Sequence, residues 1–125
     1  NYELYAFIRH VSKSGWSDKP QVRRVQIAKF NINELIASGS TKTCMILGVQ
    51  ELLDRDIFVA WDIYNYGNHK TNRSCYVSAN NIFKAFINGY LTTTDSNQKV
   101  WISDPFHLDV LLNDYIKHNW SSLGE

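Results

Sequence analysis

The chain has 125 residues, of which 44% are hydrophobic and 14% aromatic, and its formal net charge is +1. That length corresponds to one domain that can bury a core without disulfides or metals, and no apolar run reaches the ~18–20 residues that a membrane span needs. The two cysteines, Cys44 and Cys75, have neither metal-ligand nor redox spacing, which predicts reduced, buried thiols. We expect one monomeric, cytoplasmic domain over residues 1–125, excised from a larger chain.

The first half of the chain is predicted to consist mainly of strands and loops. An aromatic and aliphatic run predicts a strand at 3–9, and the polar stretch from His10 to Gln21 predicts a long loop. The pattern then predicts a strand at 22–28, a short capped helical turn at 31–37, strands at 41–48 and 57–61 separated by a turn around 51–54, and a second polar loop at 64–73.

The second half adds a short strand, a hairpin and two helices. The strand is predicted at 74–78, and the hairpin pairs 90–94 with 99–103 across residues 95–97. A helix over 79–88, stopped by Gly89, is predicted to bury one face made of Ile82, Phe83, Phe86 and Ile87. A final helix begins with Asp104 as N-cap and Pro105 in its first turn, and its apolar stripe consists of Leu108, Leu111, Leu112, Tyr115 and Ile116.

Together these elements predict a mainly β, α+β fold. About seven short strands and two helices that do not alternate exclude a doubly wound sheet and favour a compact mixed barrel. Three tryptophans in apolar patterns are expected in its core: Trp61, Trp101 and Trp120.

The sequence carries no catalytic motif. It has no Gly-rich phosphate loop, no Gly-x-Ser-x-Gly, no His-Glu-x-x-His and no Cys/His cluster, and its acids are too scattered to converge on Mg²⁺. The four histidines have no ligand spacing, and His107 and His118 are expected on the surface of the last helix. We therefore expect a domain that is not an enzyme by itself and has neither a metal site nor a cofactor.

The basic residues are unevenly distributed along the chain. Eight of the thirteen lie in the windows 9–29 and 64–74, which together contain one of the twelve acids, Asp18. From Asp95 onward the balance reverses, with five acids against Lys99 and Lys117. This polarity indicates one electropositive face, against the alternative of a solvated surface with chance clustering.

The two polar loops have a composition suited to DNA. The first interleaves cations with serines and Trp16, and such cations neutralise phosphates while hydroxyls fix the register. The second, YNYGNHKTNR, is rich in side chains that hydrogen-bond base edges, although Asn and Gly also favour ordinary turns. Arg23 and Arg24 must point to opposite faces of their strand, so at most one should face the DNA. A clasp formed by both loops requires that they leave the barrel on the same side.

This layout resembles the B3-like DNA-binding domains of plant transcription factors and of restriction endonucleases such as EcoRII. The resemblance rests on the second loop, IYNYGNHKTNRS, and on the blocks RRVQIAKF, CMILGV and DIFVAWD. It implies a seven-stranded open β-pseudobarrel with two short α-helices, whose two loops act as arms in the major groove of double-stranded DNA. The chain has fewer arginines in the second arm than EcoRII-type domains.

The resemblance also implies the DNA-binding residues and the partner. In the second arm the candidates are Tyr64, Asn65, Tyr66, Asn68, His69, Lys70, Asn72 and Arg73. In the first arm they are Arg9, His10, Lys13, Ser14, Trp16, Lys19, Arg23 and Arg24. The domain would be the recognition or effector domain of a bacterial restriction endonuclease, would read a CC(A/T)GG-type site, and would work beside a separate catalytic nuclease domain.

Two other functions fit the sequence. A reader of methylated or otherwise modified bases would need an aromatic pocket for a flipped base, which Trp16, Trp61, Tyr64 and Tyr66 could line. A protein-interaction module would use the exposed aromatics to contact a protein partner, and its charges would serve only for solvation.

Overall fold

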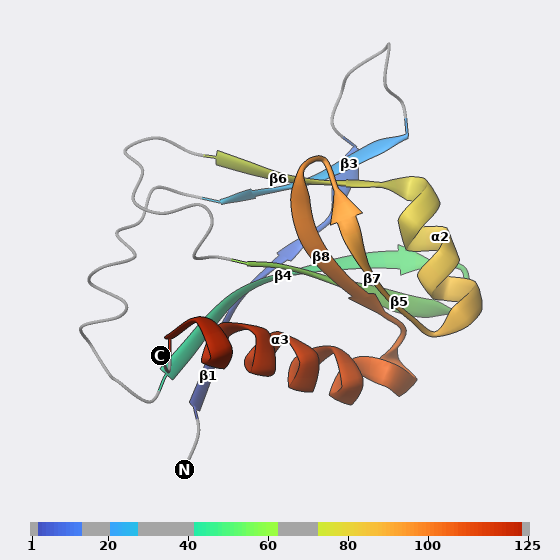
Figure 1. The fold of residues 1–125 in the computed structure, drawn as a ribbon. Coiled ribbons are helices and arrows are strands. Elements are labelled where there is room, and N and C mark those ends of the chain that lie inside the picture. The colour runs from blue at the N-terminus through green and yellow to red at the C-terminus, as the bar shows by residue number, and fades with distance from the viewer. Residues whose placement is uncertain (1–2, 14–20, 28–41, 63–72, 124–125) are drawn as a thin grey trace.

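Two β-sheets and two α-helices make up the fold in the computed structural model, which describes residues 3–13, 21–27, 42–62 and 73–123 (Figure 1). The larger sheet has the order β1-β4-β5-β8-β7, in which β1 is parallel to β4 and the other pairs are antiparallel. Its strands are β1 (Glu3–His10), β4 (Lys42–Leu52), β5 (Arg55–Trp61), β7 (Tyr90–Asp95) and β8 (Gln98–Ser103).

The smaller sheet has three antiparallel strands in the order β2-β3-β6. These strands are β2 (Ser12–Lys13), β3 (Val22–Ile27) and β6 (Arg73–Ser78). The helices are α2 (Ala79–Asn88) and α3 (Leu108–Leu123), and the short 3₁₀ helix η2 (Pro105–His107) precedes α3. The fold is mainly β and of the α+β class, as the sequence predicts, but the described residues form two sheets and no closed barrel.

A single bent strand joins the two sheets. Only Val11 separates β1 from β2, and its N–H donates to the carbonyl of Val49 on β4 at 2.9 Å. The chain therefore passes from the larger sheet to the smaller one at this corner. Gly48 makes the corner possible, because a Cβ there would lie 2.7 Å from Val11 Cγ2 and 3.0 Å from Val25 Cγ2.

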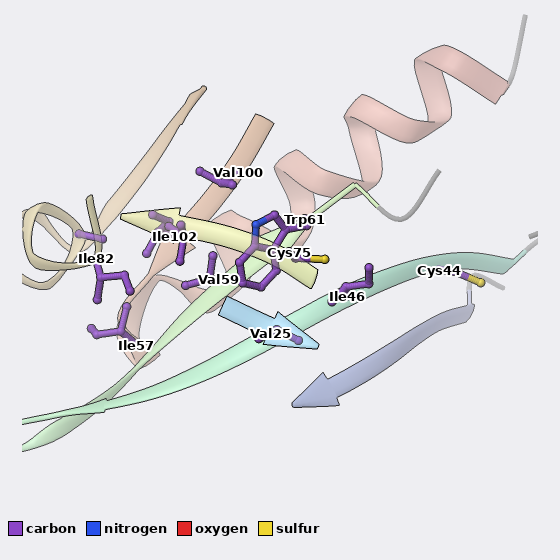
Figure 2. Close-up of a cluster of buried hydrophobic side chains, with 12 residues drawn as sticks. Val25, Cys44, Ile46, Ile57, Val59, Trp61, Cys75, Ile82, Val100 and Ile102 are labelled. Atoms are coloured by element: carbon purple, nitrogen blue, oxygen red, sulfur yellow. The ribbon is translucent and has the colours of Figure 1, made fainter. Parts of the chain in front are cut away.

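The main core lies between the two sheets. Figure 2 shows Val25 of β3 and Cys75 of β6 with the side chains of β4, β5 and β8 around Trp61. Trp61 is fully buried, and its Nε1–H donates to the carbonyl of Tyr76 at 3.0 Å, which ties β5 to β6. Cys44 and Cys75 are both buried and belong to no disulfide, as the sequence predicts.

A second core lies on the opposite face of the larger sheet, against α3. Met45, Ala60 and Trp101 pack there on Leu111 and Tyr115 of the helix, and Tyr115 donates its hydroxyl to the carbonyl of Cys44 at 2.6 Å. The resulting layers are the small sheet, the large sheet and α3 (Figure 1). Trp61 and Trp101 are thus core residues as predicted, while the side chain of Trp120 lies outside the described ones.

The predicted buried face of α2 is right for Ile82, which is buried, and for Phe86, which packs against the core, but wrong for Phe83 and Ile87. Its buried residues are Ile82 and Ala85, whereas Phe83 is 49% and Ile87 69% exposed. The stripe of α2 that faces the core is rotated relative to the predicted one. The helix contributes to the core between the sheets with the side that carries Ile82 and Ala85. The predicted ends are right: Ser78 is the N-cap, and Gly89 ends the helix with φ +91°.

Several boundaries also differ from the sequence prediction. The expected loop from His10 to Gln21 contains β2, and β4 extends through Leu52, which leaves a turn of only two residues before β5. The hairpin turn is Ser96–Asn97, with both residues at positive φ. Asp104 is an N-cap as predicted, but of the 3₁₀ turn that precedes α3. The helical turn predicted at 31–37 lies outside the described residues.

Candidate nucleic-acid interface

The smaller sheet carries the positive charge of the described fold. Its strands β2, β3 and β6 contain four basic residues and no acid: Lys13, Arg23, Arg24 and Arg73. The five strands of the larger sheet contain four basic and four acidic residues. Among the described strands, an excess of basic over acidic residues is therefore confined to the small sheet.

Strand register decides which side chains share a face of the small sheet. Residues that pair across antiparallel strands lie on the same face, and Val25 pairs with Cys75 on the core side. Arg24 pairs with Ser12 on β2 and with Tyr76 on β6, so these three lie on the outer side. Ser12 is exposed, and Arg24 and Tyr76 are half-buried.

Arg23 lies on the other side of β3, which confirms that the two adjacent arginines have opposite directions. It pairs with Val77, a fully buried core residue, and with Lys13 at the end of β2. Arg23 is half-buried and donates from Nη1 to the carbonyl of Val22 at 3.3 Å. Of the two arginines, Arg24 is therefore the one presented on the outer face.

The two predicted arms are anchored at opposite ends of the small sheet. The first arm joins β2 to β3 at the end where Val22 pairs with Ser78. The second arm enters β6 at Arg73, which pairs with Ile27 at the far end of β3. The predicted clasp requires both loops to leave the barrel on the same side; the antiparallel pairing of β3 with β6 separates their anchor points on this sheet by the length of a strand, and the loops themselves lie outside the described residues.

Few of the predicted contact residues fall in the described part of the chain. Arg9 and His10 are exposed at the end of β1, Lys13 is exposed at the end of β2, and Arg9 donates from Nη1 to the carbonyl of Ile8 at 2.8 Å. The backbone of Arg73 belongs to β6 rather than to a loop. Ten further candidates lie outside the described residues: Ser14, Trp16, Lys19, Tyr64, Asn65, Tyr66, Asn68, His69, Lys70 and Asn72.

Sequence reasoning missed Tyr76 as a member of this surface and placed Ser12 among the serines of the first loop instead of on a strand. A signal for Tyr76 was present, since β6 alternates hydroxyl-bearing with apolar residues over 74–78. With a period of two, one face of that strand carries Ser74, Tyr76 and Ser78. The position of Ser12 beside Arg24 had no such signal, because it results from the pairing of β2 with β3.

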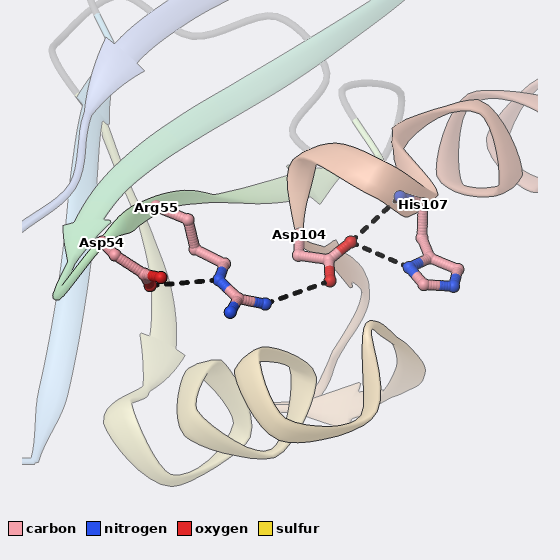
Figure 3. A network of polar contacts seen from close by, with 4 residues as sticks. All are labelled: Asp54, Arg55, Asp104 and His107. Carbon is pink, nitrogen blue, oxygen red and sulfur yellow. Dashed lines mark hydrogen bonds and ion pairs between the residues drawn. The ribbon is translucent and has the colours of Figure 1, made fainter.

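Two carboxylate–histidine pairs resemble the pairs found in catalytic sites. The first of them, Asp104 with His107, has a structural role. Asp104 is buried and accepts hydrogen bonds from the backbone N–H and from Nδ1 of His107, at 3.0 and 2.8 Å (Figure 3). Arg55 bridges Asp104 to Asp54, with 3.7 and 3.3 Å between charged atoms. This network caps η2 and fastens it to the start of β5.

The second pair joins Asp62, at the end of β5, to His118 on α3 at 3.2 Å. Of the two histidines predicted on the surface of the last helix, His107 is exposed but lies in η2, and His118 is half-buried on α3; each contacts a buried acid. The described residues contain no group of three or more His, Cys, Asp or Glu that could hold a metal ion. None of the described helices is long and apolar enough to cross a membrane.

Comparison with known proteins shows which family the chain belongs to. No curated protein matches it, and no solved structure does. Residues 2–109 match the model of the family described as Methylase-associated X1, a span that includes both sheets, α2 and the start of α3. The chain belongs to the Methylase-associated X1 family.

Proposed function

We propose that this domain binds double-stranded DNA and acts as a recognition domain in a restriction–modification system. The observation that carries the proposal is the small sheet, which anchors both polar loops and contains four cations without an acid. Cations neutralise phosphates and release counterions, which is the main source of affinity for DNA, and one of the four, Arg24, lies on the outer face of this sheet. The family description, methylase-associated, supports the restriction–modification setting.

The strand connections support an open pseudobarrel of the B3-like kind. With β1 and β2 counted as one bent strand, seven strands follow one another in the order β7-β8-β5-β4-β1/β2-β3-β6. The opening lies between β6 and β7, where Asp95 on β7 accepts from the N–H of Ser78 and from Nδ2 of Asn81, both at 2.8 Å. The two loops follow the first and the fourth of the strands counted in this way along the chain, which is the arrangement of the two B3 arms.

The separation of the anchors gives the arms a different geometry from a clasp of neighbouring loops. Five residue steps along β3, from Val22 to Ile27, span roughly 17 Å at ~3.4 Å per residue. The major groove is ~12 Å wide, so arms at the two ends of this sheet would straddle the groove and approach it from both sides. In this arrangement the second arm, from Tyr64 to Arg73, reads base edges, and the first adds phosphate contacts and a few base contacts. The domain itself supplies recognition, and a separate enzymatic domain or subunit supplies the catalysis.

The proposal is tested by selecting bound duplexes from a random library. A recurrent sequence among the bound duplexes supports specific recognition, and its identity decides whether the target is a CC(A/T)GG-type site. Arg73→Ala should then cost about 1–3 kcal/mol and relax one position of the site. Lys13→Ala should weaken binding to all sequences alike. An equal loss on all DNA for both variants would show that Arg73 does not read a base.

A second candidate function is the reading of methylated bases, which the link to methylases in the family description favours. The same selection, repeated with methylated duplexes, separates the two functions: a modified-base reader binds only the methylated pool. A domain that binds no duplex at ~50 mM salt has neither function, because even non-specific DNA binders hold DNA there. That result would support a protein-interaction module.

A further inference from the structure

We propose that the outer face of the small sheet is itself a contact site for DNA phosphates, centred on Arg24 and formed with Ser12 and Tyr76. The inference rests on the proposed function and adds a surface to it, since the proposed function assigns recognition to the two loops. The face lies between the loops, because Arg24 is two residues from Val22 at one anchor and three from Ile27 at the other.

The face is built from hydrogen-bond donors. Arg24 has Ser12 beside it on one strand and Tyr76 on the other, and paired residues on one face have Cβ atoms only ~4.5–5.5 Å apart. Along β6 the outward positions continue with Ser74 and Ser78. Arg, Ser and Tyr side chains are among those that contact phosphate oxygens, and the three strands contain no carboxylate to repel a phosphate.

The guanidinium of Arg24 also contains one buried donor. Its Nε is buried and has no hydrogen-bond partner among the described residues. A buried donor without a partner costs free energy, and such a group in a folded protein calls for an explanation. The guanidinium is a planar fork whose Nε and one Nη can donate in parallel to two oxygens of a phosphate. A small rotation of the side chain on binding DNA would satisfy this donor.

A phosphate contact here would set the position of the domain on the duplex. Phosphate contacts fix register and orientation and carry no sequence information directly. A fixed point midway between the anchors would hold both loops at defined positions along the groove. Arg24 is in this sense a positioning residue, and its loss should affect all sequences equally.

The experiment measures the affinity of the domain for a selected duplex and for a random duplex over a range of salt concentrations. Arg24→Ala should weaken both by about tenfold and reduce the slope of log K against log[salt] by about 1. Arg24→Lys should restore the slope but only part of the affinity, because the charge remains while the fork is lost. Lys84→Ala, which removes an exposed cation from α2, is the matched control and should change neither quantity.

Tyr76→Phe keeps the ring and removes only the hydroxyl, so it tests the same face even where Arg24→Ala impairs folding. It should weaken binding a few-fold on both duplexes without changing the slope. The inference is overturned if the wild type binds DNA and both variants bind as it does, or if Arg24→Ala relaxes the preference at one base pair. A wild type that binds no duplex would overturn the proposed function and this site together.

Discussion

Replacing Gly48 by alanine tests the corner at which the chain passes from one sheet to the other. The new Cβ would lie 2.7 Å from Val11 Cγ2 and 3.0 Å from both Trp61 Cζ3 and Val25 Cγ2, well inside the ~3.5–4.0 Å optimum for two carbons. Trp61 and Val25 are fully buried, so neither can move aside into solvent. Overpacking of this kind costs ~1–3 kcal/mol, and removing a glycine from a strand returns ~0.5–1 kcal/mol. We expect a net loss of about 1–2 kcal/mol.

Urea unfolding measures this loss. With a slope of ~1–3 kcal/mol per M for a small protein, the midpoint of Gly48→Ala should fall by about 0.5–1 M. Val11→Ala removes the closest atom and serves as the control. The double variant should lose less unfolding free energy than the sum of the two single losses, because the two side chains compete for one space. A neutral Gly48→Ala variant, or strictly additive losses, would refute the packing described for this corner.

Two further predictions concern single polar groups. Asp104→Ala removes the N-cap of η2 and should cost ~1–3 kcal/mol by thermal or urea unfolding, whereas Asp54→Ala, at the exposed end of the same network, should change stability by less than ~0.5 kcal/mol. Burial and the hydrogen bond to Asp114 (2.5 Å) raise the pKa of the Tyr90 hydroxyl above its usual 10.0. The folded state holds the hydroxyl proton of Tyr90 more tightly than the unfolded state does. The contribution of this group to stability is therefore complete below pH 10 and declines above it. Tyr90→Phe should therefore reduce the fall in unfolding free energy between pH 9 and 11, and an unchanged fall would contradict the assignment.

The secondary structure was largely readable from the sequence because its signals are local. Ser78 and Gly89 bound α2, Asp104 caps η2, and the alternation along β6 matches its buried and outer faces. The sheet pairing is not local. Residues 3–10 pair in parallel with residues 42–49, which are far along the chain, and no turn or spacing indicates this. The division into two sheets at Val11 could therefore not be predicted.

The candidate site shows the same contrast between local signals, which the sequence carries, and long-range pairing, which it does not reveal. Its charge pattern was evident in the sequence, and the structure places four of the cations on strands of one sheet. The separation of the two loop anchors was not evident in the sequence, because it depends on the pairing of Ile27 with Arg73. The buried face of α2 was predicted correctly for Ile82 and Phe86 but not for Phe83 and Ile87. These two have the right spacing for a core stripe, but the side that meets the sheets is set by how the helix docks.

The salt dependence of duplex binding tests the central claim most directly. If Lys13 and Arg24 each neutralise a phosphate while Arg73 contacts a base, at ~0.9 counterions released per phosphate contact, log K should fall linearly with log[salt] with a slope of about −2 or steeper. The measurement uses the intact domain and a duplex from the selected pool. A slope near zero, or no binding at ~50 mM salt, would contradict the account of the small sheet as a DNA-binding surface.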